Sequence, residues 1–119
     1  MPDTSLLDPA AIEALRSLGP DGDPSFLKEL IDIFLQDTPE RIAELEAALA
    51  RGDAPVAMRA AHTIKGSSSN FGAARLAQQA QRIEAQCKAG DCASALVLVP
   101  GLKEEFGLVA TELARLSAA

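Results

Sequence analysis

The chain of 119 residues contains no tryptophan, no tyrosine and only two cysteines. Cys87 and Cys92 are too few to hold a small domain together by disulfides, so we expect two reduced thiols. Their C-x4-C spacing has no histidine or further cysteine beside it, which argues against a zinc site. No window approaches the run of about 18 apolar residues that a membrane-spanning helix requires. We therefore expect no metal site and no membrane-spanning segment.

The amino-terminal residues also lack the basic stretch and apolar core of a secretory signal, which leads us to expect a soluble cytoplasmic protein. Basic residues are in a minority, and the net charge of −6 argues against nucleic acid as the main partner. The exception is the stretch from Gly52 to Gly90, where five basic residues stand against two acidic ones. Such a basic island steers an acidic partner or holds an anion, although a solvated helix surface explains the charges equally well.

Apolar residues make up 48% of the sequence, and many of them are alanines. This content is enough to bury the core of one domain, and small, unbranched residues favour closely packed helices over sheets. No segment alternates between apolar and polar residues for long enough to propose a strand. We therefore predict an all-α protein, an up-down antiparallel four-helix bundle with a short extra amino-terminal helix. A single domain of residues 1–119 is expected, with the bundle core at about 23–117 and the short helix and a turn in 1–22.

Capping residues mark the ends of the predicted helices. Aspartates that can begin a helix are Asp8, Asp23, Asp53 and Asp91, and glycines that can end one include Gly52, Gly72 and Gly90. The predicted helices lie at about 9–18, 24–51, 54–70 and 73–89, with a last one reaching residue 116. Pro39 predicts a kink or a break near Thr38, and Pro100 leaves open whether residues 92–99 form a separate turn or the first half of a kinked helix.

The only histidine, His62, lies in the segment RAAHTIKGSSSNFGA on the third predicted helix. At about 100° per residue, the side of the helix opposite His62 is a core-facing stripe of Ala57, Ala60, Ile64, Ser68 and Phe71. The same side as His62 carries Pro55, Met58, Arg59, Lys65, Gly66 and Ser69. The imidazole is therefore predicted to point outward.

A lone exposed histidine is often an idle surface residue, and that interpretation stays open, but its neighbours favour a site. Gly66, one turn on, costs a helix about 1 kcal/mol relative to alanine, and it clears an approach to the imidazole. Lys65 places an ammonium beside the ring, Arg59 does so more loosely from one turn back, and Ser69 offers a hydroxyl two turns on. An accessible nitrogen, a cleared approach and a nearby cation predict a site that carries a phosphoryl group.

The motifs that other histidine chemistries need are missing. The chain has no H-E-x-x-H pair and no P-loop or other glycine-rich cradle for a nucleotide. No Ser-His-acid set is evident, although residues far apart in sequence leave a spatial triad open. A metal-binding bundle is disfavoured because Glu84 is the main acidic candidate near the fourth helix and one carboxylate is not a site. Without an ATP site, the phosphoryl group must come from another protein and leave to another.

The segment AHTIKGSSSNFGA resembles the signature of histidine-containing phosphotransfer (HPt) domains, the relay modules of multistep two-component signalling. Their pattern is H-x-x-K-G-S/A-S/A, with a later glycine that closes the helix. Its positions are occupied here by His62, Lys65, Gly66, Ser67, Ser68 and Gly72. The likeness extends more loosely from about Asp23 to Leu116. Thr63 stands where histidine kinases usually carry an acidic residue, which separates this segment from theirs.

The resemblance implies a phosphorelay carrier in which His62 accepts a phosphoryl group from a receiver-domain aspartate and passes it to another receiver. Lys65 would balance the phosphate charge, Gly66 would admit the receiver, and Lys88 falls where some members carry a basic residue. The resemblance also implies no cofactor of the chain's own, Mg²⁺ supplied by the receiver, and response regulators and a hybrid sensor histidine kinase as partners. The alternative is a helical adaptor that binds response regulators without relaying phosphate. We expect a monomer, because the outer faces carry few apolar residues.

Overall fold

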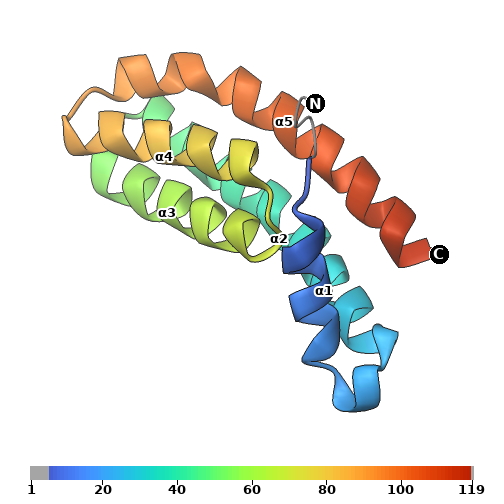
Figure 1. Ribbon diagram of the computed structural model, residues 1–119. Coiled ribbons are helices and arrows are strands. Elements are labelled where there is room, and N and C mark those ends of the chain that lie inside the picture. Colours follow the sequence, from blue (N-terminus) through green and yellow to red (C-terminus); the bar gives the residue numbers. More distant parts are fainter. Residues whose placement is uncertain (1–5, 119) are drawn as a thin grey trace, which may run out of the picture.

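The computed structural model describes residues 6–118, which fold into five α-helices and one short 3-10 turn (Figure 1). They are α1 (Pro9–Ser17), the 3-10 turn η1 (Pro20–Gly22), α2 (Pro24–Ala50), α3 (Ala54–Asn70), α4 (Ala74–Lys88) and α5 (Cys92–Ala118). Residues 6–118 contain no strand. The predicted all-α class is confirmed, with one short helix ahead of four long ones. None of the helices described combines the length and the apolar character that crossing a membrane requires.

The four long helices form the bundle. Each packs against the next one along the chain, and α5 closes the ring by packing against α2. In Figure 1, α3 and α4 run side by side in opposite directions, with residues 71–73 between them, and α5 runs back along the bundle. The short helix α1 lies against α2. The short loops therefore fix which helices are neighbours, and they bring α2 and α4 to the two sides of α3.

Aspartate side chains begin four of the helices, as the sequence predicts. The carboxylates of Asp8, Asp23, Asp53 and Asp91 each accept a backbone N–H from the first turn of the following helix, at 2.9 to 3.3 Å. A cap of this kind contributes about 1 kcal/mol because it satisfies a donor that has no partner inside the helix. The exception is α4, which follows Ala73 and has no side-chain cap.

The turn between α3 and α4 depends on Gly72. Its φ of +68° is a left-handed conformation that glycine adopts readily, and this confirms the predicted end of the third helix. A Cβ at this position would lie 2.4 Å from Cβ of Asp8. A side chain would therefore be strained in its backbone and would also displace the residue that caps α1. Gly72 thus sets where α4 starts relative to His62.

Neither proline inside a long helix breaks it. Helix α2 runs through Pro39 and α5 runs through Pro100, so residues 92–99 are the first half of α5. The sequence predicted a kink or a break near Thr38, and no break occurs. Both prolines are exposed, whereas Thr38 and Val99 directly before them are buried. Each proline removes one backbone donor on the solvent side, while the residues around it remain packed on the core.

The core is aliphatic and draws on every bundle helix. The largest fully buried side chains include Ile31, Leu45, Ile64, Leu76, Ile83, Leu102 and Leu113. The ring of Phe34 packs against those of Phe71 and Phe106, with centroids 5.0 and 5.7 Å away. On α3, three of the five buried residues are alanines. Short side chains let α3 lie close to its neighbours and leave its outer side at the surface.

Candidate functional site

His62 projects from the outer side of α3. Its side chain is 65% exposed. The residues expected on the opposite side of the helix are all buried: Ala57, Ala60, Ile64, Ser68 and Phe71. The predicted phase of this helix is therefore confirmed, although buried Ala61 makes the core-facing stripe wider than the periodicity indicated. The imidazole thus stands on a rigid helix with its ring open to solvent.

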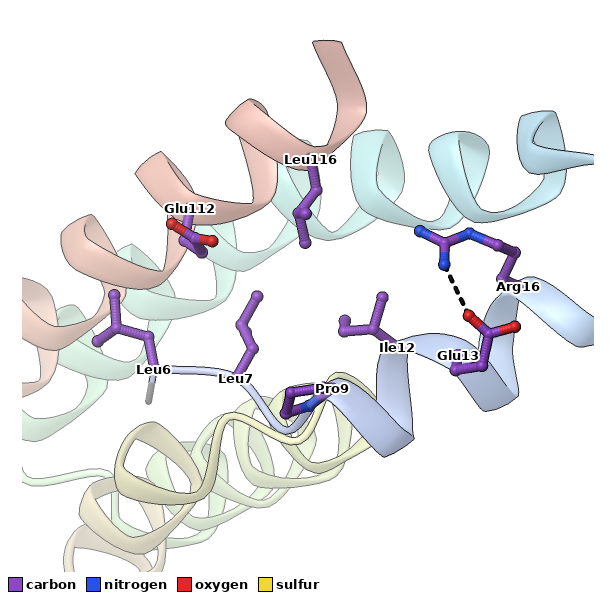
Figure 2. Close-up of a pocket in the computed structure, with 8 residues that line it drawn as sticks. All are labelled: Leu6, Leu7, Pro9, Ile12, Glu13, Arg16, Glu112 and Leu116. Atoms are coloured by element: carbon purple, nitrogen blue, oxygen red, sulfur yellow. Dashed lines mark hydrogen bonds and ion pairs between the residues drawn. The ribbon is translucent and has the colours of Figure 1, made fainter. Parts of the chain in front are cut away.

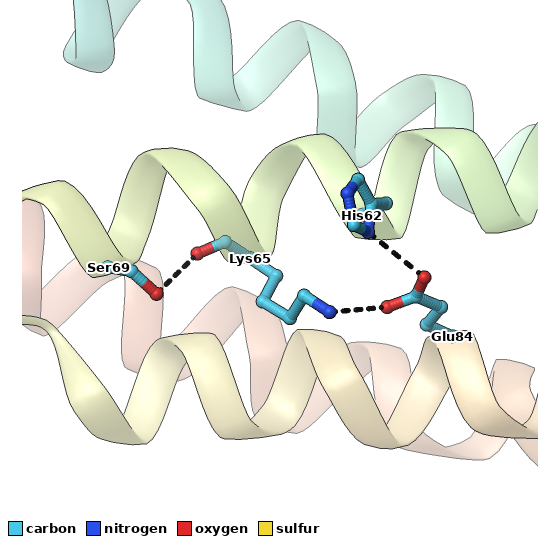
Figure 3. Close-up of polar contacts among 4 residues, drawn as sticks. All are labelled: His62, Lys65, Ser69 and Glu84. Atoms are coloured by element: carbon cyan, nitrogen blue, oxygen red, sulfur yellow. Dashed lines mark hydrogen bonds and ion pairs between the residues drawn. The ribbon is translucent and has the colours of Figure 1, made fainter.

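Glu84 of α4 binds both His62 and Lys65 (Figure 3). Its Oε2 lies 3.1 Å from Nδ1 of His62, and its Oε1 lies 3.0 Å from Nζ of Lys65. Only 12% of the Glu84 side chain is exposed, so the carboxylate sits in the groove between α3 and α4 beneath the histidine. Both oxygens have a donor, which fixes the orientation of the carboxylate and, through it, that of the ring.

The ionisation of Glu84 decides which ring nitrogen carries the proton. Burial raises the pKa of Glu84, but the hydrogen bonds from Lys65 and His62 outweigh it and bring the pKa below its ordinary value of 4.5. The group is therefore an ionised carboxylate at neutral pH and only accepts hydrogen bonds. His62 must then donate from Nδ1, and this assignment leaves the lone pair on Nε2 free.

Lys65 reaches the imidazole only through Glu84. The sequence predicts an ammonium beside the ring, but the Nζ atom is bound to the carboxylate oxygen that His62 does not use (Figure 3). Sequence reasoning set Glu84 aside as a single acidic residue, whereas the structure makes it the link between the other two. The half-buried ammonium and carboxylate hold each other in place, because each lowers the cost of removing the other from water. The role of Lys65 in balancing phosphate charge stays a prediction.

Gly66 leaves open space beside His62. The residue is exposed, and a Cβ built on it would meet no atom within 4 Å. It lies inside α3 and is not among the glycines with a positive φ. Neither the backbone conformation nor the packing therefore requires a glycine here, even though glycine costs a helix about 1 kcal/mol relative to alanine. The fold itself gives no reason for Gly66.

The other predicted residues are Ser69, Arg59 and Lys88, and none of them contacts His62 or Glu84 through a hydrogen bond or ion pair within residues 6–118. Ser69 donates its hydroxyl to the carbonyl oxygen of Lys65 at 2.9 Å, so its proton is used within α3 (Figure 3). Arg59 and Lys88 are exposed, and neither forms an ion pair within residues 6–118. Because α3 and α4 are antiparallel, Arg59 one turn before His62 and Lys88 one turn after Glu84 lie on the same side of the site, away from Lys65. The structure brings only Lys65 into contact with the carboxylate under the histidine.

A shallow hollow borders α3 on the side of α2, opposite the side that Lys65 occupies. Its volume is about 150 Å³, and its lining is Leu15, Leu30, Ile33, Phe34, Asp37, Thr38, Ser67, Asn70 and Phe71. Ile33 is 61% exposed, which is unusual for a large apolar side chain. By helical phase, Gly66 lies between His62 and this hollow. Sequence periodicity did not single out Ile33, because it lies outside the apolar stripe of α2.

Within residues 6–118, the features away from the histidine offer no comparable site. A hollow of about 560 Å³ lies between α1 with its preceding residues and α5, and none of the predicted site residues lines it (Figure 2). Cys87 and Cys92 are both free, and burial, followed by the charges of Cys92 and Glu84, raises the pKa of the Cys87 thiol. No group of three or more His, Cys, Asp or Glu within residues 6–118 is placed to hold a metal ion. The candidate site is therefore an exposed surface, suited to a protein partner more than to a small enclosed ligand.

Comparisons with known proteins agree on one family. Residues 29–119 match the family model described as Hpt domain. The chain is 33% identical over 85 residues to the phosphorelay intermediate protein rdeA of Dictyostelium discoideum, a match that covers 71% of this chain and 34% of rdeA. It is 28% identical over 101 residues to histidine-containing phosphotransfer protein 4 of Arabidopsis thaliana, covering 83% of this chain and 80% of that protein.

A solved structure is similar over nearly the whole chain. The crystal structure of histidine-containing phosphotransfer protein B (HptB) from Pseudomonas aeruginosa PAO1 has a TM-score of 0.87 and 30% sequence identity. The likeness covers 98% of this chain and 97% of that one. The arrangement of all five helices, including short α1, is therefore shared with a protein of that description.

Proposed function

Because this chain belongs to the Hpt domain family, we propose that it carries phosphoryl groups in a phosphorelay and that His62 is the residue phosphorylated. His62 accepts the group from an aspartate of one receiver domain and passes it to an aspartate of another. The observation that carries this proposal is an exposed imidazole whose Nδ1 is held by Glu84 at 3.1 Å, which leaves Nε2 free to react.

Transfer follows from that geometry. The lone pair of Nε2 attacks the phosphorus of the aspartyl phosphate in line, the N–P bond forms, and the P–O bond to the aspartate breaks with its electron pair on the departing carboxylate. Mg²⁺ and the acidic pocket around it belong to the receiver in this proposal. In this proposal the chain binds no ATP, and its contribution is to position the ring on a helix.

Cations around the ring compensate the arriving charge. The phosphoryl group adds negative charge close to the Glu84 carboxylate, and Lys65 is the cation already in contact with that carboxylate at 3.0 Å. We assign charge balance to Lys65. Arg59 and Lys88, which approach from the other side, are assigned to the acidic edge of the receiver, where long-range attraction speeds docking. Ser69 lines the site as a hydrogen-bond acceptor, because its own proton is used within the helix.

The receiver docks over the α2 side of His62. Gly66 provides the open approach to the ring, since nothing lies within 4 Å of where its Cβ would be. Ile33, beside the hollow between α2 and α3, supplies an apolar anchor next to that approach. A few buried apolar anchors carry most of the affinity in protein interfaces, with polar contacts around them. The partners that we propose, from membership of the family, are response regulators and a hybrid sensor histidine kinase.

Phosphate transfer from purified receivers tests the proposal. A panel of phosphorylated receiver domains is incubated with the chain and Mg²⁺, and the protein-bound phosphate is tested for stability in acid and base. The wild type is expected to take up acid-labile, base-stable phosphate from at least one receiver. The His62→Gln variant, with unchanged helix content by circular dichroism, is expected to take up none.

The same assay separates a relay carrier from a relay-inactive adaptor. A wild type that binds receivers yet stays unlabelled with every member of the panel is an adaptor, and equal labelling of His62→Gln places the phosphate elsewhere. A cytoplasmic location, a monomeric state and the lack of a nucleic-acid partner stay predictions from the sequence.

A further inference from the structure

The residue that supports His62 is a carboxylate, although a neutral acceptor would be enough to orient the ring. Nδ1 needs only one hydrogen-bond acceptor, and the amide oxygen of a glutamine would offer one. Glu84 instead brings a full negative charge to 3.1 Å from Nδ1, in a position where only 12% of its side chain is exposed. The charge must then be held by a second contact, which Lys65 provides at 3.0 Å. The carboxylate therefore places a negative charge beside the ring in addition to orienting it.

We propose that Glu84 keeps the proton on Nδ1 of His62 while the ring is phosphorylated, so that the phosphoryl group arrives and leaves without a proton being lost from or returned to the ring. Glu84 is in this sense a positioning residue that acts through His62. The inference rests on the proposed function, and it concerns how readily phosphorylated His62 gives its phosphoryl group away.

The proton balance shows why this matters. When neutral His62 attacks through Nε2, the product has a proton on Nδ1 and phosphorus on Nε2, and its ring is an imidazolium cation. If Nδ1 keeps its proton, the next receiver aspartate attacks phosphorus, the N–P bond breaks with its electron pair on Nε2, and neutral imidazole leaves. If Nδ1 has lost its proton, the leaving group is an imidazolate anion, which is far poorer. Transfer is therefore fast only from the protonated ring.

An anionic acceptor favours this protonated ring more than an amide does. An opposite charge within about 4–6 Å shifts a pKa by about 1 to 3 units toward the charged form. Glu84 lies within that distance of the imidazolium. Its carboxylate is largely shielded from water, whereas the ring is 65% exposed, so water screens the pair only in part. Lys65 weakens the effect in part because it shares the carboxylate. Removing Glu84 or Lys65 should therefore move the titration of the phosphorylated ring in opposite directions.

By helix register, charged groups on all three helices around the site stand at about the level of His62. On α3 these are Arg59 and Lys65, and on α4 they are Glu84 and Lys88. On α2 they are Asp37, Arg41 and Glu44. Arg41 forms ion pairs with Glu44 at 2.7 Å and with Asp37 at 3.9 Å. Within residues 6–118, only Glu84 forms an ion pair with His62. Glu84 is therefore the group whose replacement should dominate the change in the ring's titration.

Chemical phosphorylation gives a test that needs no cognate receiver. Wild type, Glu84→Gln and Lys65→Met are phosphorylated with phosphoramidate, and the phosphorylated ring is titrated by ³¹P and ¹⁵N NMR. Glu84→Gln is expected to lower the titration midpoint by about one pH unit or more, and Lys65→Met is expected to raise it. Above the wild-type midpoint, donation from Glu84→Gln to a receiver domain with Mg²⁺ should be about tenfold slower. Before phosphorylation, both variants should keep the proton on Nδ1 in ¹⁵N spectra.

Two results would overturn the inference. One is an equal midpoint in the wild type and Glu84→Gln. The other is a lowered midpoint in Lys65→Met as well, because a general loosening of the site, and not the carboxylate charge, would then be responsible. Failure of the relay function itself is distinguishable, since it would show as no exchange of phosphate with receivers while the NMR titration remained measurable.

Discussion

Gly66 provides a direct test of whether the surface around His62 is shaped for a partner. Replacing it with alanine adds a methyl group in a helical position where no atom lies within 4 Å. The change removes glycine's helix penalty without creating a clash, so Gly66→Ala should raise the free energy of unfolding by about 1 kcal/mol. For a domain of this size, that corresponds to a rise in melting temperature of about 4 °C.

Two other glycines serve as matched controls. Gly107, inside α5, is also exposed, with nothing within 4 Å of the position that a Cβ would take, so Gly107→Ala should stabilise the protein by a similar amount. Gly72→Ala should destabilise it, because φ is +68° and the Cβ would lie 2.4 Å from Cβ of Asp8. Urea unfolding followed by circular dichroism gives the three values under identical conditions.

Phosphate transfer from a receiver supplies the second half of this test. Gly66→Ala and, more strongly, Gly66→Gln should fold yet transfer slowly, because a side chain intrudes where the partner approaches. Gly107→Ala should transfer at the wild-type rate. The reasoning is refuted if Gly66→Ala lowers stability, since the fold would then need the glycine, or if Gly66→Gln transfers normally, since the open space would then serve no partner.

Three further predictions concern other residues. Lys65→Ala should shorten the lifetime of phosphorylated His62 with unchanged helix content, and an unaltered lifetime would remove Lys65 from the site. Ile33→Asp should weaken receiver binding by about tenfold or more in titration calorimetry. Leu108 is an exposed apolar residue on α5, and equal weakening by Leu108→Asp would show that Ile33 is not a specific anchor for the receiver. The pKa of Glu84 is lower in the folded protein than its ordinary value of 4.5, so the ionised carboxylate stabilises the fold above about pH 4.5. This stabilisation is lost as the pH falls through the pKa of Glu84 in the folded protein. Wild type should thus lose more stability than Glu84→Gln on acidification, and parallel urea-unfolding curves would contradict this.

The parts of the structure that depend on local chemistry were predictable. The aspartate caps, the left-handed turn at Gly72 and the outward direction of His62 all follow from neighbours within a few residues, and all are confirmed. The continuity of α2 and α5 through their prolines was not predictable, because it depends on which side of each helix faces solvent and on the packing of Thr38 and Val99. A local rule states what a proline removes, and tertiary packing decides whether the helix survives it.

Glu84 shows what periodicity alone leaves out. Its contact with His62 depends on the register between two helices, and the pattern within either helix does not contain that register. A signal was nevertheless present. His62 and Glu84 stand at equal sequence distances on either side of Ala73, next to a short turn that makes α3 and α4 antiparallel, so the two side chains reach the same level of the bundle. Counting outward from a predicted turn would have paired them.

The most direct test of the account is the identity of the atom that carries the phosphoryl group. The wild type is incubated with a phosphorylated receiver domain and Mg²⁺, and the labelled protein is analysed by ¹⁵N and ³¹P NMR. The expected spectrum shows phosphorus on Nε2 of His62 and a proton on Nδ1 at neutral pH. A phosphoryl group on Nδ1 or on another residue, or a receiver that docks and keeps its phosphate, would contradict the account.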